Sequence, residues 1–446
     1  MGILTVSLLR AMRKPQFFQT VPIIVELEEG ANPAALAANL QQTLGIETRQ
    51  VLPMSNAFSV IAPTEMVNEL AGIRYVKQIH LDRTMYAFQE PPLPPFGTLG
   101  DRIQEIMSNP QIMLTPNEGW IGTAEVLKSI GVYELHKRGV KGQGVKVWVL
   151  DTGVDITNPQ LQGIVAGAHS TTFGTPADGN GHGTFCATEI AGQFYTEPLL
   201  KIDMLGVAPE CELHCVKVLT DLGFGNTSDI MKGIELALSS GAQIISMSLG
   251  GESDPEAEET DPMVTLINKA AETHPQTTFI VAAGNSGEEG ETAGSTVGTP
   301  ANAANALTVG AVSLIDAGKR CYYSSTGPTA QARRTKPDIC APGGGLARAS
   351  GYPKGMGDLY SGTAFASQLD PMDKLVNSCT SLKGTSMATP LVAGILSLWR
   401  QLVPQLKTEE IKKIFAKYSG RPQTNELGYG TIDSTWILQA LGQAGA

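Results

Sequence analysis

Three glycine-rich stretches place a carboxylate, an imidazole and a hydroxyl where each could take part in covalent chemistry. An apolar run ends in Asp151, and the glycine two residues later permits a sharp exit from a strand. His182 lies between two glycines at the expected start of a helix, which leaves its ring approachable. Ser386 opens an apolar helix, where unpaired backbone amides favour developing negative charge. Together these residue types supply a nucleophile, a base and a group that orients the base.

Each of the three residues has a simpler interpretation when taken alone. An aspartate at a strand end can cap a turn, a single histidine is usually packed or exposed, and a serine at a helix start is usually an N-cap. The set is more specific, because a serine hydroxyl is a poor nucleophile until an imidazole takes its proton. The imidazole in turn needs a carboxylate that fixes its tautomer. Asp151, His182 and Ser386 therefore predict a catalytic triad.

The elements that must position these residues follow from the pattern after about residue 119. Short apolar runs of strand length alternate there with helix-like segments such as residues 229–239 and 262–273. The runs are residues 145–150, 212–219, 243–249 and 278–282. This alternation predicts an α/β fold with a parallel sheet flanked by helices on both faces. Functional groups gather at the carboxyl ends of such strands, and Asp151 directly follows the first run.

The first 88 residues have the pattern of a separate, smaller unit. Asn32 and Pro33 give the N-cap and first turn of a helix that Gly45 ends. The whole order is β-α-β-β-α-β, with expected strands at residues 21–27, 46–52, 57–62 and 73–81. That order predicts a small ferredoxin-like α+β domain over residues 1–88.

Residues 89–118 are expected to link the two units. Four of the five residues 91–95 are proline, which holds a backbone extended and removes amide donors. Such an exposed segment is accessible to proteolysis. We therefore expect a processing region between the small unit and a catalytic domain over residues 119–446.

Several motifs of the larger unit resemble those of the subtilase family. D-T-G, H-G-T and G-T-S-M-A stand at residues 151–153, 182–184 and 384–388, in the order of the family's three signature motifs. Further matches are G-V-A-P at 206–209, S-L-G-G at 248–251, A-A-G-N at 282–285 and K-P-D at 336–338. The resemblance covers about residue 119 to the C-terminus, and residues before about 88 are similar to the family's inhibitory prodomain. It implies a subtilisin-like serine endopeptidase of broad specificity, made as a self-processed zymogen.

The same resemblance implies a role for further residues. Asn285 would donate its side-chain amide to the oxyanion formed by attack on a peptide carbonyl, together with the Ser386 backbone amide. The walls of the pocket for the residue before the cut would be Ser248, Leu249, Gly250, Ala282, Ala283 and Gly284. An extended substrate would pair with these backbone edges as an added strand.

The preference of that pocket has two interpretations. Gly298 at its floor would leave room for a large side chain. Glu288, Glu289 and Glu291 could instead favour a basic residue, although a charge run is usually a solvated loop. The Thr-Pro bond at residues 299–300 resembles a family site that often holds a cis peptide.

The resemblance implies that peptide hydrolysis by this chain needs no cofactor. A structural calcium ion is compatible with it, but residues 193–204 lack a clear match to the family's calcium loop, so no metal ligand is assigned. Six cysteines in this length demand no disulfide framework. We interpret Cys186 as a buried inert thiol rather than a redox regulator. Residues 343–383 exceed the family's usual length and are expected to add a loop near the active face.

Composition and charge exclude several function classes. The chain is 42% hydrophobic and 17% charged, which favours a folded core. Its net charge of −11 argues against nucleic acid as a partner. No apolar run approaches the ~18 residues of a membrane span, and the basic residues near the N-terminus follow their apolar stretch, unlike in a secretory signal. We expect a monomer whose partners are peptide substrates and its own prodomain, either cytoplasmic or exported by a route that the sequence does not show.

Two other functions agree less well with these residues than a protease does. A binding or scaffold protein that kept the fold without activity is disfavoured, because all four chemical positions are intact. A lipase or esterase on an α/β-hydrolase fold would require G-x-S-x-G at the nucleophile and the chain order Ser, Asp, His. Neither condition holds around Ser386.

Overall fold

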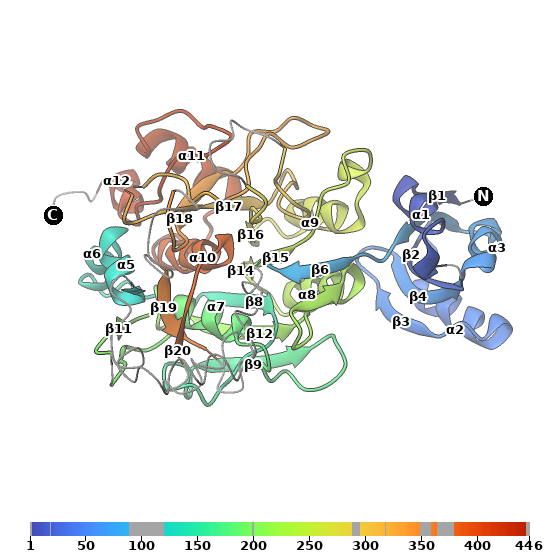
Figure 1. Cartoon of the computed structure of the whole chain (residues 1–446), viewed down its shortest axis with the longest axis horizontal. Helices are drawn as coiled ribbons and strands as arrows, with labels where there is room; N and C mark the ends of the chain where they lie inside the picture. The colour runs from blue at the N-terminus through green and yellow to red at the C-terminus, as the bar shows by residue number, and fades with distance from the viewer. Residues whose placement is uncertain are drawn as a thin grey trace, which may run out of the picture.

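The computed structural model describes residues 2–17, 19–88, 120–198, 200–287, 295–316, 318–347, 358–363 and 379–442. These residues form a small N-terminal unit (residues 2–88) and a larger C-terminal unit (residues 120–442), which lie side by side in Figure 1. The expected linker at residues 89–118 lies outside the described residues.

The N-terminal unit contains the expected β-α-β-β-α-β order. Its elements are β2 (Thr20–Leu27), α2 (Pro33–Leu44), β3 (Thr48–Leu52), β4 (Ala57–Pro63), η2 (Thr64–Met66), α3 (Val67–Gly72) and β5 (Val76–Leu81). Asn32 caps α2 by accepting the amide of Ala35, and Gly45 ends the helix with a left-handed φ of 69°. Alternate residues of β2 and β4 are buried in one core beneath the two helices.

The first residues of the chain extend this unit in a way that the sequence pattern did not indicate. They form β1 (Ile3–Leu4), α1 (Val6–Ala11) and η1 (Pro15–Phe17), and the strand order becomes β1-β5-β2-β4-β3. The Thr5 side chain caps α1, and Leu8 and Ala11 anchor that helix in the core. These segments are too short to show a hydrophobic period.

The C-terminal unit is built on the predicted parallel sheet. Its strand order is β18-β17-β16-β14-β8-β12-β9, and the ladders between neighbours are parallel. The strands are β8 (Lys146–Asp151), β9 (Val165–Ser170), β12 (Glu212–Lys217), β14 (Ile244–Met247), β16 (Thr278–Ala282), β17 (Leu307–Val312) and β18 (Ile339–Pro342). The four apolar runs of the sequence correspond to β8, β12, β14 and β16, so these predictions are confirmed.

Helices cover both faces of this sheet, as expected. Side chains of β8 alternate between two cores: Val147 and Val149 pack with α7 and α10, whereas Trp148 and Leu150 pack with α8 and α9. The helices are α5 (Thr123–Ser129), α6 (Val132–His136), α7 (His182–Ala191), α8 (Thr227–Ser239), α9 (Pro262–Thr273), α10 (Thr385–Leu402), α11 (Thr408–Tyr418) and α12 (Trp436–Ala440), with the short η4 (Glu258–Thr260). No helix among the described residues is long and apolar enough to cross a bilayer.

The N-terminal sheet packs on α8 and α9 of the C-terminal unit (Figure 1). Asp82 accepts hydrogen bonds from the amide and hydroxyl of Ser228 at the start of α8, at 2.9 and 2.7 Å. Farther along α8, the Glu235 carboxylate accepts the amides of Met54 and Ser55 at 2.9 and 3.2 Å. One carboxylate from each unit, Asp82 and Glu235, therefore helps to hold the two units together around an apolar contact.

The end of the N-terminal unit enters the C-terminal unit as a strand. This strand is β6 (Thr84–Ala87), which reaches from the N-terminal unit to β15 in Figure 1. It lies between β13 (Phe224–Asn226) and β15 (Leu249–Gly250) and runs antiparallel to both. Each edge of β6 is thus hydrogen-bonded to the larger unit.

The expected extra segment at residues 343–383 is described in part. It contributes β19 (Leu359–Gly362) and β20 (Cys379–Leu382), which pair with each other, while β19 also pairs with β7 (Ile121–Gly122). A second short hairpin joins β10 (Tyr195–Thr196) to β11 (Asp203–Met204). Thr363, just after β19, donates its hydroxyl to the Gly181 carbonyl at 3.0 Å, so the segment supports the start of α7.

Candidate active site

The structure brings two of the predicted triad residues into direct contact. Asp151 is the last residue of β8 and His182 the first of α7, and both side chains are buried. The distance between Asp151 Oδ1 and His182 Nδ1 is 2.7 Å. A carboxylate in this position holds the proton on Nδ1 and leaves Nε2 as an acceptor.

The third residue, Ser386, is the second residue of α10, two residues after the N-cap Gly384. Cys186 lies near both Ser386 and His182: its sulfur is 4.0 Å from His182 Nδ1 and 3.7 Å from the Ser386 carbonyl oxygen. Ser386 Oγ is 2.8 Å from the carbonyl oxygen of Phe88 and 3.0 Å from that of Ser248. His182 Nε2 is buried without a hydrogen-bond partner among the described residues. Of the hydrogen bonds expected in the triad, the one between Asp151 and His182 is therefore present, whereas the Ser386 hydroxyl lies against backbone carbonyls.

Asn285 is oriented by the residue that precedes Ser386. Asn285 Oδ1 accepts the amide and the hydroxyl of Thr385, at 3.0 and 2.9 Å. Since an amide hydrogen can only donate, this contact fixes the side-chain oxygen on that side. The Asn285 nitrogen then faces the Phe88 carbonyl oxygen at 3.1 Å.

The carbonyl of Phe88 thus lies between the two predicted chemical groups. Its oxygen is within hydrogen-bonding distance of both Ser386 Oγ and Asn285 Nδ2, and the Phe88 amide donates to the Ser248 carbonyl at 3.3 Å. Phe88 immediately follows β6, so the strand delivers this peptide group to the site. No sequence motif predicted its position, because it depends on how the two units pack.

Glycines leave space for the Phe88 ring, as the predicted pocket requires. A Cβ atom on Gly250 would come within 2.6 Å of the ring, and one on Gly298 or Gly284 within 3.6 or 3.7 Å. The remaining wall residues lie around this space. Leu249 pairs with Ala87 in the β15–β6 ladder, Ala282 ends β16, and Ala283 accepts the Gly298 amide. Of the expected wall residues, Gly250 and Gly284 lie beside the Phe88 ring.

Two further expectations about this pocket have different outcomes. The peptide bond between Thr299 and Pro300 is cis, as the resemblance implied. Glu288, Glu289 and Glu291 lie outside the described residues, so the basic-residue interpretation stays untested.

Asp178 is a buried residue of the site that the motifs did not reveal. Its Oδ1 accepts the Thr152 hydroxyl at 2.9 Å and the Gly181 amide at 2.8 Å, and its Oδ2 accepts the amide and hydroxyl of Thr184. These bonds tie the loop after Asp151 to the first turn of α7. The available signal was an acid four residues before a helix-starting histidine, where carboxylates satisfy free amides.

Burial shifts the pKa values of two other ionisable groups of α7 in the direction of their uncharged forms. It raises the pKa of the Cys186 thiol well above its usual value, which agrees with the interpretation as an inert thiol. It also raises the pKa of Glu189 well above that of a solvated carboxyl group.

The structure thus has the groups that a serine hydrolase uses: an imidazole bonded to a carboxylate, a hydroxyl at a helix start and a fixed amide donor, all on a parallel α/β sheet. A sequence model described as the Subtilase family matches residues 142–431. The chain belongs to this family of subtilisin-like serine proteases.

Individual relatives cover different shares of the chain. Serine protease AprX of Bacillus subtilis is 28% identical over 425 residues, which is 90% of this chain and 84% of the relative. The thermostable alkaline protease of Halalkalibacterium halodurans is 28% identical over 397 residues, 88% of this chain and 91% of the relative. Subtilisin Savinase of Lederbergia lenta is 37% identical over 303 residues, 67% of this chain and 92% of the relative.

Proposed function

We propose that this subtilase is an active endopeptidase, made as a zymogen that cleaves its own chain after Phe88. The observation that carries the proposal is the position of the Phe88 carbonyl group. Its oxygen lies 2.8 Å from Ser386 Oγ and 3.1 Å from Asn285 Nδ2, so a peptide group of the chain itself occupies the place of a substrate.

The reaction follows from this geometry. The Ser386 hydroxyl turns its hydrogen to His182 Nε2 and attacks the Phe88 carbonyl carbon, while Asp151 stabilises the imidazolium through Nδ1. Asn285 and the Ser386 amide stabilise the negative oxygen. The bond to the next residue then breaks as the imidazolium protonates the departing amine, which leaves an ester on the serine. Water, activated by the same imidazole, hydrolyses that ester.

The two units have separate roles in this proposal. Residues 1–88 act as an inhibitory prodomain that also assists folding, residues 89–118 link it to the enzyme, and residues 119–446 form the catalytic domain. Support comes from β6, which is paired on both edges and fills the site. After the cut, the prodomain stays bound as a product until it dissociates or is degraded.

The residues of β6 also indicate which substrates fit. P1 denotes the residue before the cut, so Phe88 is P1 and Met85 is P4. Met85 is 1% exposed and lies against Gly251, where a side chain would collide with its sulfur. Tyr86, at P3, is 54% exposed. We therefore propose an aromatic preference at P1, an apolar one at P4 and broad tolerance between them.

The test uses the full chain and one substitution at the nucleophile. Wild-type protein is expected to yield a mature form whose N-terminal sequence begins at Gln89 or later, and which a fluorophosphonate labels at Ser386. Ser386→Ala should remain at full length, as measured by intact mass. Self-cleavage of Ser386→Ala at the wild-type rate would remove the proposal, and a folded mature protein that resists labelling would favour the scaffold alternative.

A further inference from the structure

Arg83 extends the substrate-like segment beyond the residues that fill the proposed pockets. It lies five residues before Phe88, at P6. The Arg83 carbonyl accepts the amide and the hydroxyl of Thr227 at 2.8 and 3.2 Å, which continues the ladder between β6 and β13. The backbone at P6 is therefore bound by the catalytic domain, directly before the paired residues P5 to P2.

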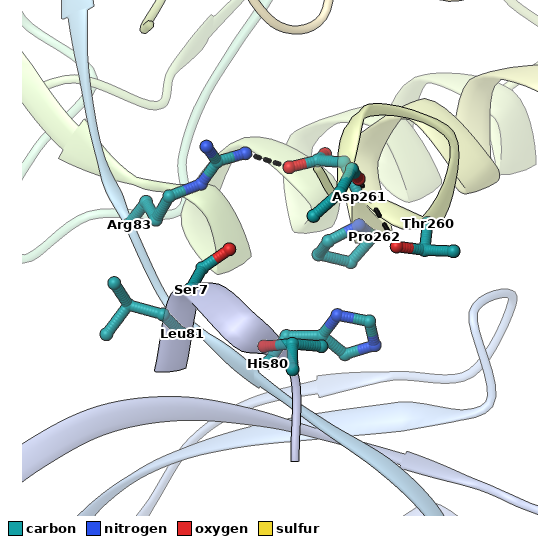
Figure 2. Close-up of a pocket in the computed structure, with 9 residues that line it drawn as sticks. Ser7, His80, Leu81, Arg83, Thr260, Asp261 and Pro262 are labelled. Atoms are coloured by element: carbon teal, nitrogen blue, oxygen red, sulfur yellow. Dashed lines mark hydrogen bonds and ion pairs between the residues drawn. The ribbon is translucent and has the colours of Figure 1, made fainter. Parts of the chain in front are cut away.

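The Arg83 side chain is bound by two acceptors of the catalytic domain. One guanidinium nitrogen forms an ion pair and hydrogen bond with Asp261 Oδ2, and the other donates to the Glu252 carbonyl at 3.3 Å. Figure 2 shows Arg83 pointing from the strand toward Asp261 at the start of α9. The exposed fractions of the two side chains are 19% for Arg83 and 3% for Asp261.

Asp261 is held in place by its own domain. It is the N-cap of α9, and its Oδ1 accepts the amides of Met263 and Val264 at 2.9 and 3.2 Å. Because this cap fixes one oxygen, Oδ2 keeps its direction after the prodomain leaves. A largely buried carboxylate is stabilised by a cation in reach, so departure of Arg83 leaves an acceptor suited to another guanidinium.

The charges around Asp261 favour the same kind of ligand. The acids of residues 252–261 are Glu252, Asp254, Glu256, Glu258, Glu259 and Asp261. Glu259 is paired with Arg334 of the catalytic domain, at 2.6 Å for each oxygen. Asp254 and Glu256 instead contact Ser7 and Arg10 of the prodomain, at 2.6 and 2.7 Å. The prodomain thus places two arginines on one acidic loop.

We propose that Asp261 and the Glu252 carbonyl form a sixth substrate subsite, S6, which selects arginine at P6 of peptide substrates. This inference rests on the proposed endopeptidase function. Arginine is favoured over lysine, because a planar guanidinium reaches both acceptors at once and an ammonium group does not. Neutral residues bind less well at P6, and acidic residues are rejected by the loop.

The experiment compares peptides with the mature, self-processed enzyme. Internally quenched peptides carry the sequence X-Thr-Met-Tyr-Ala-Phe-Gln, in which X at P6 is arginine, lysine, citrulline, alanine or glutamate. We expect kcat/KM about ten-fold higher for arginine than for alanine, with lysine between them and glutamate lowest. Citrulline keeps the shape of arginine without its charge and should behave like alanine, which tests the ion pair without any change to the enzyme.

Substitutions then locate the preference. Asp261→Asn keeps an acceptor for the cap of α9 but removes the charge, and should bring the arginine-to-alanine ratio of kcat/KM close to one. Glu256→Gln is the matched control, since this acid lies on the same loop but pairs with Arg10; the ratio should persist.

The S6 subsite and the endopeptidase function would be contradicted by different results. Equal kcat/KM for arginine and alanine at P6 in the wild-type enzyme would overturn S6 and assign the Arg83–Asp261 pair to prodomain binding alone. Hydrolysis of none of the peptides, including shorter ones that begin at P4, would instead overturn the endopeptidase function on which S6 depends.

Discussion

At the scale of single residues, the site depends on carboxylates with different tasks. Asp151 faces the imidazole directly, whereas Asp178 contacts neither the imidazole nor the Phe88 carbonyl. Asp178 instead accepts bonds from both sides of the site, from Thr152 and from the first turn of α7. We regard it as a positioning residue that keeps His182 at the right distance from Asp151.

Asp178→Asn should therefore lower kcat without a comparable change in KM. The new amide group places donors opposite the amide and hydroxyl of Thr184, so the first turn of α7 shifts and the imidazole is misplaced. A displacement of this kind lowers kcat by about 10- to 100-fold. KM should change little, because β13 and β15 do not rest on this residue.

Steady-state kinetics with a P1-phenylalanine peptide check this prediction. Asp155→Asn is the control, because this acid lies in the loop after β8, accepts hydrogen bonds from Thr157 and leaves the Asp178 bonds in place. An Asp178→Asn enzyme with wild-type kcat and a normal melting temperature would contradict the positioning role.

At the residue scale, the sequence predicts site residues that stand in a short local motif. Asp151, His182, Ser386 and Asn285 could be predicted because each stands in a short glycine-rich pattern. Phe88 stands in no such pattern, and its place in the site arises from contacts between chain segments far apart.

At the scale of elements, sequence patterns predicted the strands that are continuously apolar. Strand β9 was not predicted because it is only partly buried and carries alanine, glycine and histidine. Strand β17 contains Gly310, where a side chain would collide with Cys340 of β18, and β18 itself is only four residues long. Composition at such positions reflects close packing between neighbours, which a periodicity does not show.

Two buried carboxyl groups in the contact between the N-terminal unit and α8 make the association of the units sensitive to pH. Burial raises the pKa of Asp82, which accepts hydrogen bonds from Ser228 at the start of α8, from 3.8 to about 6. Burial also raises the pKa of Glu235 on the same helix. Both carboxyl groups return toward their ordinary pKa values when the units separate and water reaches them.

The complex therefore binds more protons than its separated parts between about pH 4 and 6. By linkage, the association strengthens as the pH falls through this window and weakens as it rises. We expect the cleaved prodomain to dissociate roughly ten-fold more readily at pH 8 than at pH 5.

Size-exclusion chromatography of the cleaved complex at each pH measures this dissociation without reference to activity. Asp82→Asn cannot ionise and should flatten the dependence, while Glu28→Gln, a change in the same unit outside this contact, should leave it intact. Equal dissociation of the wild-type complex at both pH values would refute the assignment.

At the scale of the whole molecule, the first cut is expected to occur within one chain. Phe88 already lies beside Ser386 of the same molecule, so the effective concentration of this bond does not depend on the solution. The rate constant for the appearance of the cut should stay unchanged over about a hundred-fold range of protein concentration.

Gel densitometry of newly folded protein at several dilutions measures that rate. Ser386→Ala protein mixed with wild type is the control for cutting between molecules, and it should be cleaved more slowly and in proportion to the wild-type concentration. A rate of wild-type processing that rises linearly with concentration would show that the cut is made by a neighbour.

Once β6 leaves, β13 and β15 face each other as two open strand edges with a gap one strand wide. A polypeptide can fill that gap only if its own backbone amides and carbonyls are free on both sides over several consecutive residues. Segments inside a native sheet or helix do not meet this condition until they unravel locally. We therefore expect the enzyme to cleave unfolded segments of a protein faster than segments within its native sheets and helices.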